Sequence, residues 1–115
     1  MNADKKTKVR KNSRRKGADG ERELAALLRD YGYDARRGQQ YSGCNGDADV
    51  IGIPGVHIEC KRVEHLNIDA ALDQAISDAR AKGEMPAVFH RKNKRPWMVT
   101  LRIEDFIELI HRTEC

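Results

Sequence analysis

No apolar run in this sequence is long enough to span a bilayer, and none follows the basic N-terminus as a secretory signal would require. The 115 residues are 39% hydrophobic and 35% charged, which is typical of a globular domain with a very polar surface. A chain of this length has room for one domain with a modest core. These features predict a cytosolic protein.

Cysteines are too few and too scattered for a disulfide framework. Cys44, Cys60 and Cys115 are odd in number and form no CxxC pair. Bridged domains of this size usually carry an even set, so we expect reduced thiols. A zinc site from Cys44, Cys60, His57 and His65 is an alternative, but it lacks the paired spacing of zinc modules.

Positive charge is concentrated at the N-terminus. Residues 1–17 hold eight lysines and arginines against one aspartate, whereas the rest of the chain holds 14 basic and 17 acidic residues. A basic segment with almost no large apolar side chain is expected to be disordered when free. It is either a solubility tail or an arm that binds nucleic-acid phosphates. We therefore divide the chain into an arm at 1–17 and a folded domain at 18–115.

Hydrophobic periodicity and turn residues predict eight elements in the order α-β-β-β-α-β-β-α. The expected elements are helices at 19–31, at 68–82 and around Ile103 to Ile110, and strands at 33–37, 49–53, 56–61, 86–90 and 96–101. Three strands between two helices, with another strand after the second helix, predict an α/β fold in which helices cover a mixed sheet.

The segment Ile58–Lys61 is the first indication of chemistry. Side chains alternate on a strand, so Ile58 and Cys60 lie on one face and Glu59 and Lys61 on the other. On their own, the two charged side chains favour a half-exposed strand whose polar face meets water. The preceding strand adds Asp49, which opens that strand after a glycine-rich loop.

Pairing of these two strands can place the carboxylates of Asp49 and Glu59 side by side. Such carboxylates repel unless a divalent cation lies between them, and oxygen ligands with open positions suit Mg²⁺ or Mn²⁺. A metal at this place can polarise a phosphodiester and lower the pKa of a bound water. Lys61 can then hold the attacking water or stabilise the extra charge on phosphorus.

The turn at Pro54 and Gly55 decides whether Asp49 reaches this face. A two-residue loop would pair Glu59 with Val50 and point Asp49 away. Pro-Gly favours a type II turn, whose twist does not suit tight two-residue hairpins. We therefore predict a loop of odd length, or a bulge, which puts Asp49 on the face of Glu59.

Glu21 is the fourth candidate. It precedes Leu24 by three residues and Leu28 by seven, so it belongs to the core-facing stripe of the first helix. An acid favoured by the helix dipole in the first turn would explain Glu21 equally well, as it explains Glu23. The sequence leaves both interpretations open.

These residues together resemble the PD-(D/E)xK nuclease superfamily, and most closely its archaeal-type and phage-type Holliday junction resolvases. The resemblance covers about residues 16–101 and rests on Lys16–Leu24, Ser42-Gly43, Asp47–Gly52, Ile58–Lys61 and Gln74. It implies a restriction-endonuclease-like core, a nuclease domain at 18–115 and a metal-dependent endodeoxyribonuclease activity. It also implies a DNA recombination or repair enzyme that a phage or prophage could encode.

The resemblance gives four residues a role. Glu21, Asp49 and Glu59 would serve the metal site, with Mg²⁺ or Mn²⁺ as cofactor, and Lys61 would serve catalysis. Restriction and repair nucleases share this core, so a nicking or other structure-specific nuclease is an alternative to a resolvase. A DNA-binding module that kept the fold without the chemistry is another, against which the retention of all four residues argues.

Two further matches and one departure concern the surroundings of the site. Ser42 matches a loop serine near the scissile phosphate, and Gln74 matches a helix glutamine beside the site. The family commonly has proline before the aspartate, where this chain has Ala48, and Asp47 is a rival carboxylate. We prefer Asp49 because the apolar strand begins directly after it.

Resolvases of this type resemble homodimers, and a dimer suits a four-way junction because one small domain cannot reach two symmetric phosphates. The expected phosphate contacts are Lys5, Lys6, Lys8, Arg10, Lys11, Arg14, Arg15, Lys16, Arg36, Arg37, Arg62, Arg91, Lys92, Lys94 and Arg95. The cluster at 91–95 could equally be a solvated hairpin tip. We expect His57, His65 and His90 at the surface or on phosphates, and Trp97 in the core.

Overall fold

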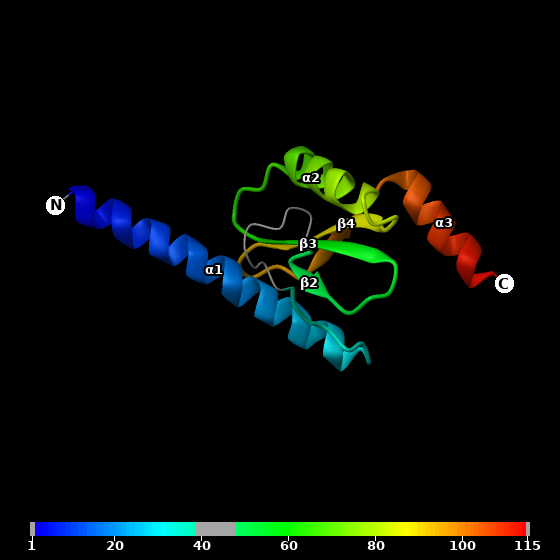
Figure 1. Ribbon diagram of the computed structural model, residues 1–115. Coiled ribbons are helices and arrows are strands. Elements are labelled where there is room, and N and C mark those ends of the chain that lie inside the picture. Colours follow the sequence, from blue (N-terminus) through cyan, green and yellow to red (C-terminus); the bar gives the residue numbers. More distant parts are fainter. Residues whose placement is uncertain (1, 39–47, 115) are drawn as a thin grey trace.

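The computed structural model describes the backbone of residues 2–38 and 48–114, and within these ranges the side chains from residue 15 onward. Its elements follow the predicted order. They are α1 (Asn2–Asp30), β1 (Arg36–Arg37), β2 (Val50–Ile51), β3 (Val56–Arg62), α2 (Ile68–Arg80), β4 (Met85–Arg91), β5 (Met98–Thr100) and α3 (Ile103–Thr113). Figure 1 shows α1 and α2 on opposite sides of the strands, with α3 at the far end.

The strands form one mixed sheet in the order β1-β2-β3-β4-β5. Neighbouring strands are antiparallel except β3 and β4, which pair in parallel from Val56 with Met85 to Arg62 with Arg91. A parallel pair needs a long crossover, and α2 provides it. The predicted α/β fold, a mixed sheet flanked by helices, is therefore confirmed.

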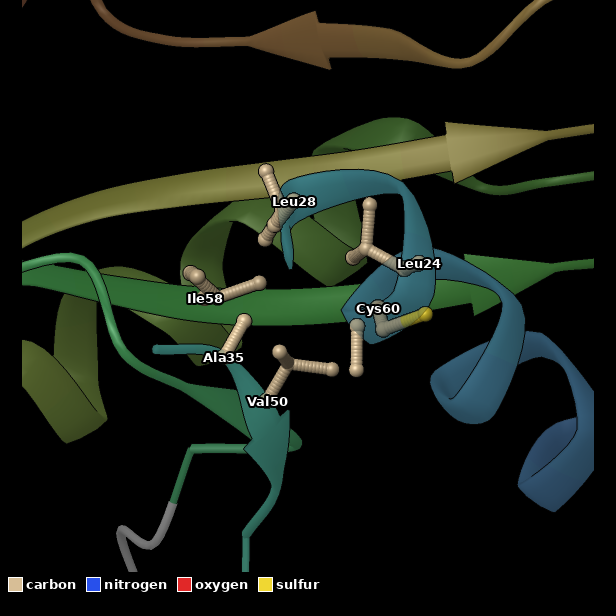
Figure 2. Packing of buried hydrophobic residues seen from close by; sticks show 7 residues of the cluster. Leu24, Leu28, Ala35, Val50, Ile58 and Cys60 are labelled. Carbon is tan, nitrogen blue, oxygen red and sulfur yellow. The ribbon is translucent and has the colours of Figure 1, made fainter. Parts of the chain in front are cut away.

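One face of β3 packs against α1. Figure 2 shows Ile58 and Cys60 pointing toward Leu24 and Leu28 of α1, with Val50 of β2 beside them. Full burial of such aliphatic side chains stabilises a fold by about 1.5–3 kcal/mol each. The indole of Trp97 packs against the same cluster, as expected for a core residue.

The opposite face of β3 lies under α2. On this side Ala71 and Ala75 of α2 pack against Val88 of β4. His57 and Glu59 are buried here, although both are polar. The face that carries Glu59 is therefore not the half-exposed strand surface that the sequence also allowed.

Helix α1 begins at Asn2, whereas the sequence led us to expect a start near residue 19. Lysine, arginine and alanine have high helix propensities, and their sum over the basic segment favours one continuous helix over a separate N-terminal cap at Asp19. The first half of α1 projects away from the sheet (Figure 1). None of the helices described is both long and apolar enough to cross a membrane.

Candidate active site

The register between β2 and β3 brings Asp49 to Glu59. Val50 pairs with Ile58, which leaves seven residues between them, an odd number. The predicted odd arrangement is confirmed, because a plain two-residue hairpin would have paired Val50 with Glu59. The backbone N–H of Cys60 donates a hydrogen bond to Asp49 Oδ2 at 2.9 Å, and this bond fixes the carboxylate beside that of Glu59.

The four predicted residues line one cleft of about 540 Å³. Asp49 directly precedes β2, Glu59 and Lys61 come from β3, and Glu21 comes from α1. Its other lining residues are Lys16, Gly17, Cys60, Arg62, Val63, Glu64 and His65. Three carboxylates and one ammonium group from three elements therefore open into the same space.

Close packing of α1 on β3 holds Glu21 at this cleft. A Cβ atom at Gly20 would lie 2.4 Å from the Cβ of Arg62, so only glycine permits this approach. The Glu21 carboxylate then accepts a hydrogen bond from Nε of Arg37 at 2.9 Å. Its position at the cleft supports the inner-stripe interpretation of Glu21.

The two central carboxylates influence each other strongly. Burial, together with repulsion from the Glu59 carboxylate, raises the pKa of Asp49 to about 7. Burial also opposes ionisation of Glu59, but contacts with His57 and Asp49 and the charge of Lys61 outweigh it and lower the Glu59 pKa. Without a cation, the pair therefore holds one proton up to about neutral pH.

The donor set fits a hard divalent cation. Asp49, Glu59 and Glu21 offer only oxygen ligands, which Mg²⁺ and Mn²⁺ prefer. Burial, and after it the charge of Glu59, raise the pKa of Asp49, and both oppose a negative charge at this place. A bound cation would offset the repulsion between the two carboxylates, and Cys60 is unsuited to be a ligand because burial raises its thiol pKa well above the usual range.

Two other predicted residues are not placed at the cleft. Ser42 lies outside the described residues, as do the rival carboxylate Asp47 and Cys44 of the alternative zinc site. Gln74 is exposed on α2 and does not line the cleft. Its side-chain amide instead donates to both carboxylate oxygens of Asp78, at 3.0 and 3.1 Å.

Several predicted phosphate-binding arginines contact acids within the protein. Glu23 of α1 accepts a hydrogen bond from Arg91 Nη1 and another from the indole N–H of Trp97, and lies 3.7 Å from Arg62 Nε. Arg37 binds Glu21, as described above. The other expected basic residues with described side chains are Arg15, Lys16, Arg36, Lys92, Lys94 and Arg95, of which Lys92, Lys94 and Arg95 are exposed between β4 and β5.

The expectation that His57 lies at the surface was wrong. Its side chain has 0% exposure, because β3 places it under α2 two residues before Glu59. His65 is exposed at the cleft, while His90 is half-buried with its ring nitrogen 2.9 Å from the Thr100 hydroxyl. The period of two along β3 could have identified His57 as a neighbour of Glu59, but no sequence signal pointed to its other neighbour, Asp78.

A mixed sheet between helices, with acids and a lysine converging at the paired strands, defines a PD-(D/E)xK nuclease fold. The chain belongs to the family described as "Phage putative PDDEXK endonuclease", whose model matches residues 12–114. No curated protein matches it significantly.

Among solved structures, the fold is similar to that of Hjc from Archaeoglobus fulgidus, a Holliday junction resolvase from an archaeal hyperthermophile. The two share 24% sequence identity with a TM-score of 0.56, over 77% of this chain and 74% of that one. The likeness establishes the restriction-endonuclease-like fold, and the family establishes the class as endonuclease.

Proposed function

We propose that this chain is a metal-dependent endodeoxyribonuclease that cuts branched DNA, most specifically a four-way junction, and that it acts as a homodimer. The observation that carries the proposal is the convergence of Glu21, Asp49, Glu59 and Lys61 in one cleft. Four side chains typical of this chemistry, drawn from three elements, would be an unexpected coincidence on a surface without it.

Glu21, Asp49 and Glu59 would hold the cation. When bound, Mg²⁺ or Mn²⁺ would polarise the scissile phosphate and make a water more acidic. Asp49 is fixed by the Cys60 N–H, so its carboxylate needs little reorganisation to bind. Glu21 would have to share or release Arg37, whose guanidinium would then be free to contact a phosphate.

Lys61 would act on the reacting phosphate itself. It lies two residues after Glu59 on the same face of β3, and its side chain lines the cleft. From there the ammonium group can orient the attacking water or stabilise the negative charge that develops on phosphorus. Lys61 would therefore act on the attacking water or the phosphate, whereas the three carboxylates would bind the metal.

The homodimer is supported by the outer face of α3. Phe106, Ile107 and Ile110 are exposed on this helix, and Ile103 is 79% exposed, while Asp105 is buried. Exposed apolar faces of this kind mark interaction sites. The acids Glu104 and Glu108 precede the basic end of α3, so an antiparallel second copy would place opposite charges together.

The cleavage assay uses a four-way junction, a plain duplex and a flap, each with Mg²⁺ or with EDTA. Symmetric paired cuts in the junction alone, only with Mg²⁺, are the expected result. Cutting of flaps or duplex would instead indicate a nicking or other structure-specific nuclease. Binding without cutting of any substrate would contradict an enzymatic role and favour a DNA-binding module.

The basic segment is tested by deleting residues 1–15. We expect weaker junction binding and a flatter dependence on salt, because each lost phosphate contact reduces the counterions released. Equal affinity of the truncated and full-length chains at every salt concentration would contradict the arm. For the dimer, Phe106→Asp should give a monomer in light scattering, whereas Tyr31→Asp, at an exposed position near the end of α1, should leave the dimer intact.

A further inference from the structure

His57 is an unusual buried residue. It has 0% exposure, and neither ring nitrogen has a hydrogen-bond partner among the described residues. Buried polar groups are normally hydrogen-bonded, because otherwise they lose their contacts with water without replacement. A histidine left in this way requires another partner.

Two carboxylates lie close enough to His57 to bind one metal ion together with it. One ring nitrogen of His57 and one carboxylate oxygen from each of Glu59 and Asp78 all lie within 4.8 Å of one another. His57 and Glu59 come from the same face of β3, and Asp78 comes from α2, which covers that face. One imidazole and two carboxylates form a common set of transition-metal ligands.

The neighbours of these three residues orient them as ligands. Nε2 of His57 is 3.9 Å from Glu59 Oε2, and Nδ1 is 3.8 Å from Glu84 Oε1, both longer than a hydrogen bond. Glu84 is thus placed to take the N–H of one nitrogen while the other turns its lone pair to the cluster, as is usual for metal-bound histidines. Gln74 holds the Asp78 carboxylate by donating to both of its oxygens.

We propose that His57, Glu59 and Asp78 form a second cation site that takes Zn²⁺ or Mn²⁺ in preference to Mg²⁺. The imidazole gives this selectivity, because Mg²⁺ favours oxygen ligands and waters. The site rests on the proposed function in one respect, since Glu59 would belong to both sites. It also gives a role to Gln74, which binds Asp78 and does not line the cleft.

Metal-free full-length protein is titrated with Zn²⁺ against a chromophoric chelator. Asp78→Asn should lower the Zn²⁺ affinity at least about tenfold, the scale on which even supporting residues of metal sites act. Asp73→Asn is the matched control, since it removes the same charge from an exposed position of the same helix, and it should leave the affinity unchanged. Equal Zn²⁺ affinity in the wild type and Asp78→Asn would overturn the proposal.

A second measurement observes His57 directly. The resonances of His57 are those missing from the spectrum of His57→Gln, and thermal unfolding checks that this variant folds. Saturation with Zn²⁺ should shift one imidazole ¹⁵N resonance of His57. Unshifted resonances would show that His57 is only an ion-pair partner of Glu59 and Glu84, and would reject the site.

The two proposals fail in different ways. Zn²⁺ binding that depends on Asp78, in a protein that cuts no DNA with Mg²⁺, would keep the second site and reject the nuclease function. Mg²⁺-dependent cleavage by a protein whose Zn²⁺ affinity ignores Asp78→Asn would do the reverse. Asp49→Asn should abolish cleavage, while Zn²⁺ binding should still depend on Asp78, since Asp49 is not part of the His57 cluster.

Discussion

The two faces of β3 use the same alternation for opposite purposes. Toward α1, Ile58 and Cys60 bury apolar surface, and the residues there are interchangeable with others of similar size. Toward α2, Glu59 and His57 are buried beside other charged or polar groups. Burial of such groups does not by itself stabilise the folded state. Under the proposed function, the first face provides stability and the second face provides the chemistry.

Glu59→Gln should give the largest effect on the chemical face. The amide keeps the shape of the side chain but loses the charge that holds a cation, so cleavage should fall on the order of 10³-fold or more as several kcal/mol of charge stabilisation are lost. Junction cleavage under single-turnover conditions measures this, and gel-shift binding should change little. Substantial cleavage by Glu59→Gln would separate this face from the chemistry.

Ile58→Ala is the corresponding change on the apolar face. It should lower the free energy of unfolding by about 2–5 kcal/mol, because Ile58 is fully buried against α1 and its removal leaves a cavity. Urea denaturation measures the loss. Cleavage well below the unfolding transition should remain within a few fold of wild type, and a loss comparable to that of Glu59→Gln would erase the distinction between the faces.

Gly20→Ala tests the packing that joins α1 to β3. The new Cβ would meet Arg62 at 2.4 Å, so α1 must shift and stability should fall by about 1–3 kcal/mol. Gly17→Ala, where the same atom meets nothing within 4 Å, should instead stabilise α1 by up to about 1 kcal/mol. Thermal unfolding of both variants gives the comparison, and equal shifts in the same direction would contradict the tight contact.

The pH dependence of metal binding tests whether Asp49 takes part in holding the cation. Mg²⁺ needs Asp49 ionised, so its affinity should fall about tenfold per pH unit below 7 and level off above it. Calorimetry in buffers of different ionisation enthalpy should detect about one proton released per ion at pH 6. An affinity that stays constant from pH 5.5 to 8 would show that Asp49 binds no cation.

The same raised pKa predicts how the metal-free protein responds to pH. The folded state binds the Asp49 proton more tightly than the unfolded state, in which the pKa is near 3.8. This difference stabilises the protein at low pH, and the stabilisation is lost as the pH rises toward 7. Asp49→Asn should remove this part of the pH dependence of unfolding, which urea denaturation across the range can measure.

Local sequence features were sufficient to predict much of this structure. Period-two and helical patterns gave the element order, and the twist of a Pro54-Gly55 turn was enough to place Asp49 opposite Glu59. The proximity of His57 to Asp78 was missed because it depends on how α2 lies across the sheet, which no local pattern specifies. The ion pairs of Arg62 and Arg91 with Glu23 could not be read from residue type either, and phosphate binding by these two arginines stays a prediction.

Glu21 and Glu23 stand two positions apart on α1 and contact different partners, since one reaches the cleft and the other binds Arg91 and Trp97. A single turn of helix thus both fastens the helix to the sheet and delivers a carboxylate to the cleft. Inserting one residue between them would rotate one relative to the other by about 100°. The spacing of these two acids therefore fixes their relative directions around the axis of α1. Residues can be added to α1 before this turn without disturbing the two sets of contacts, but not within it.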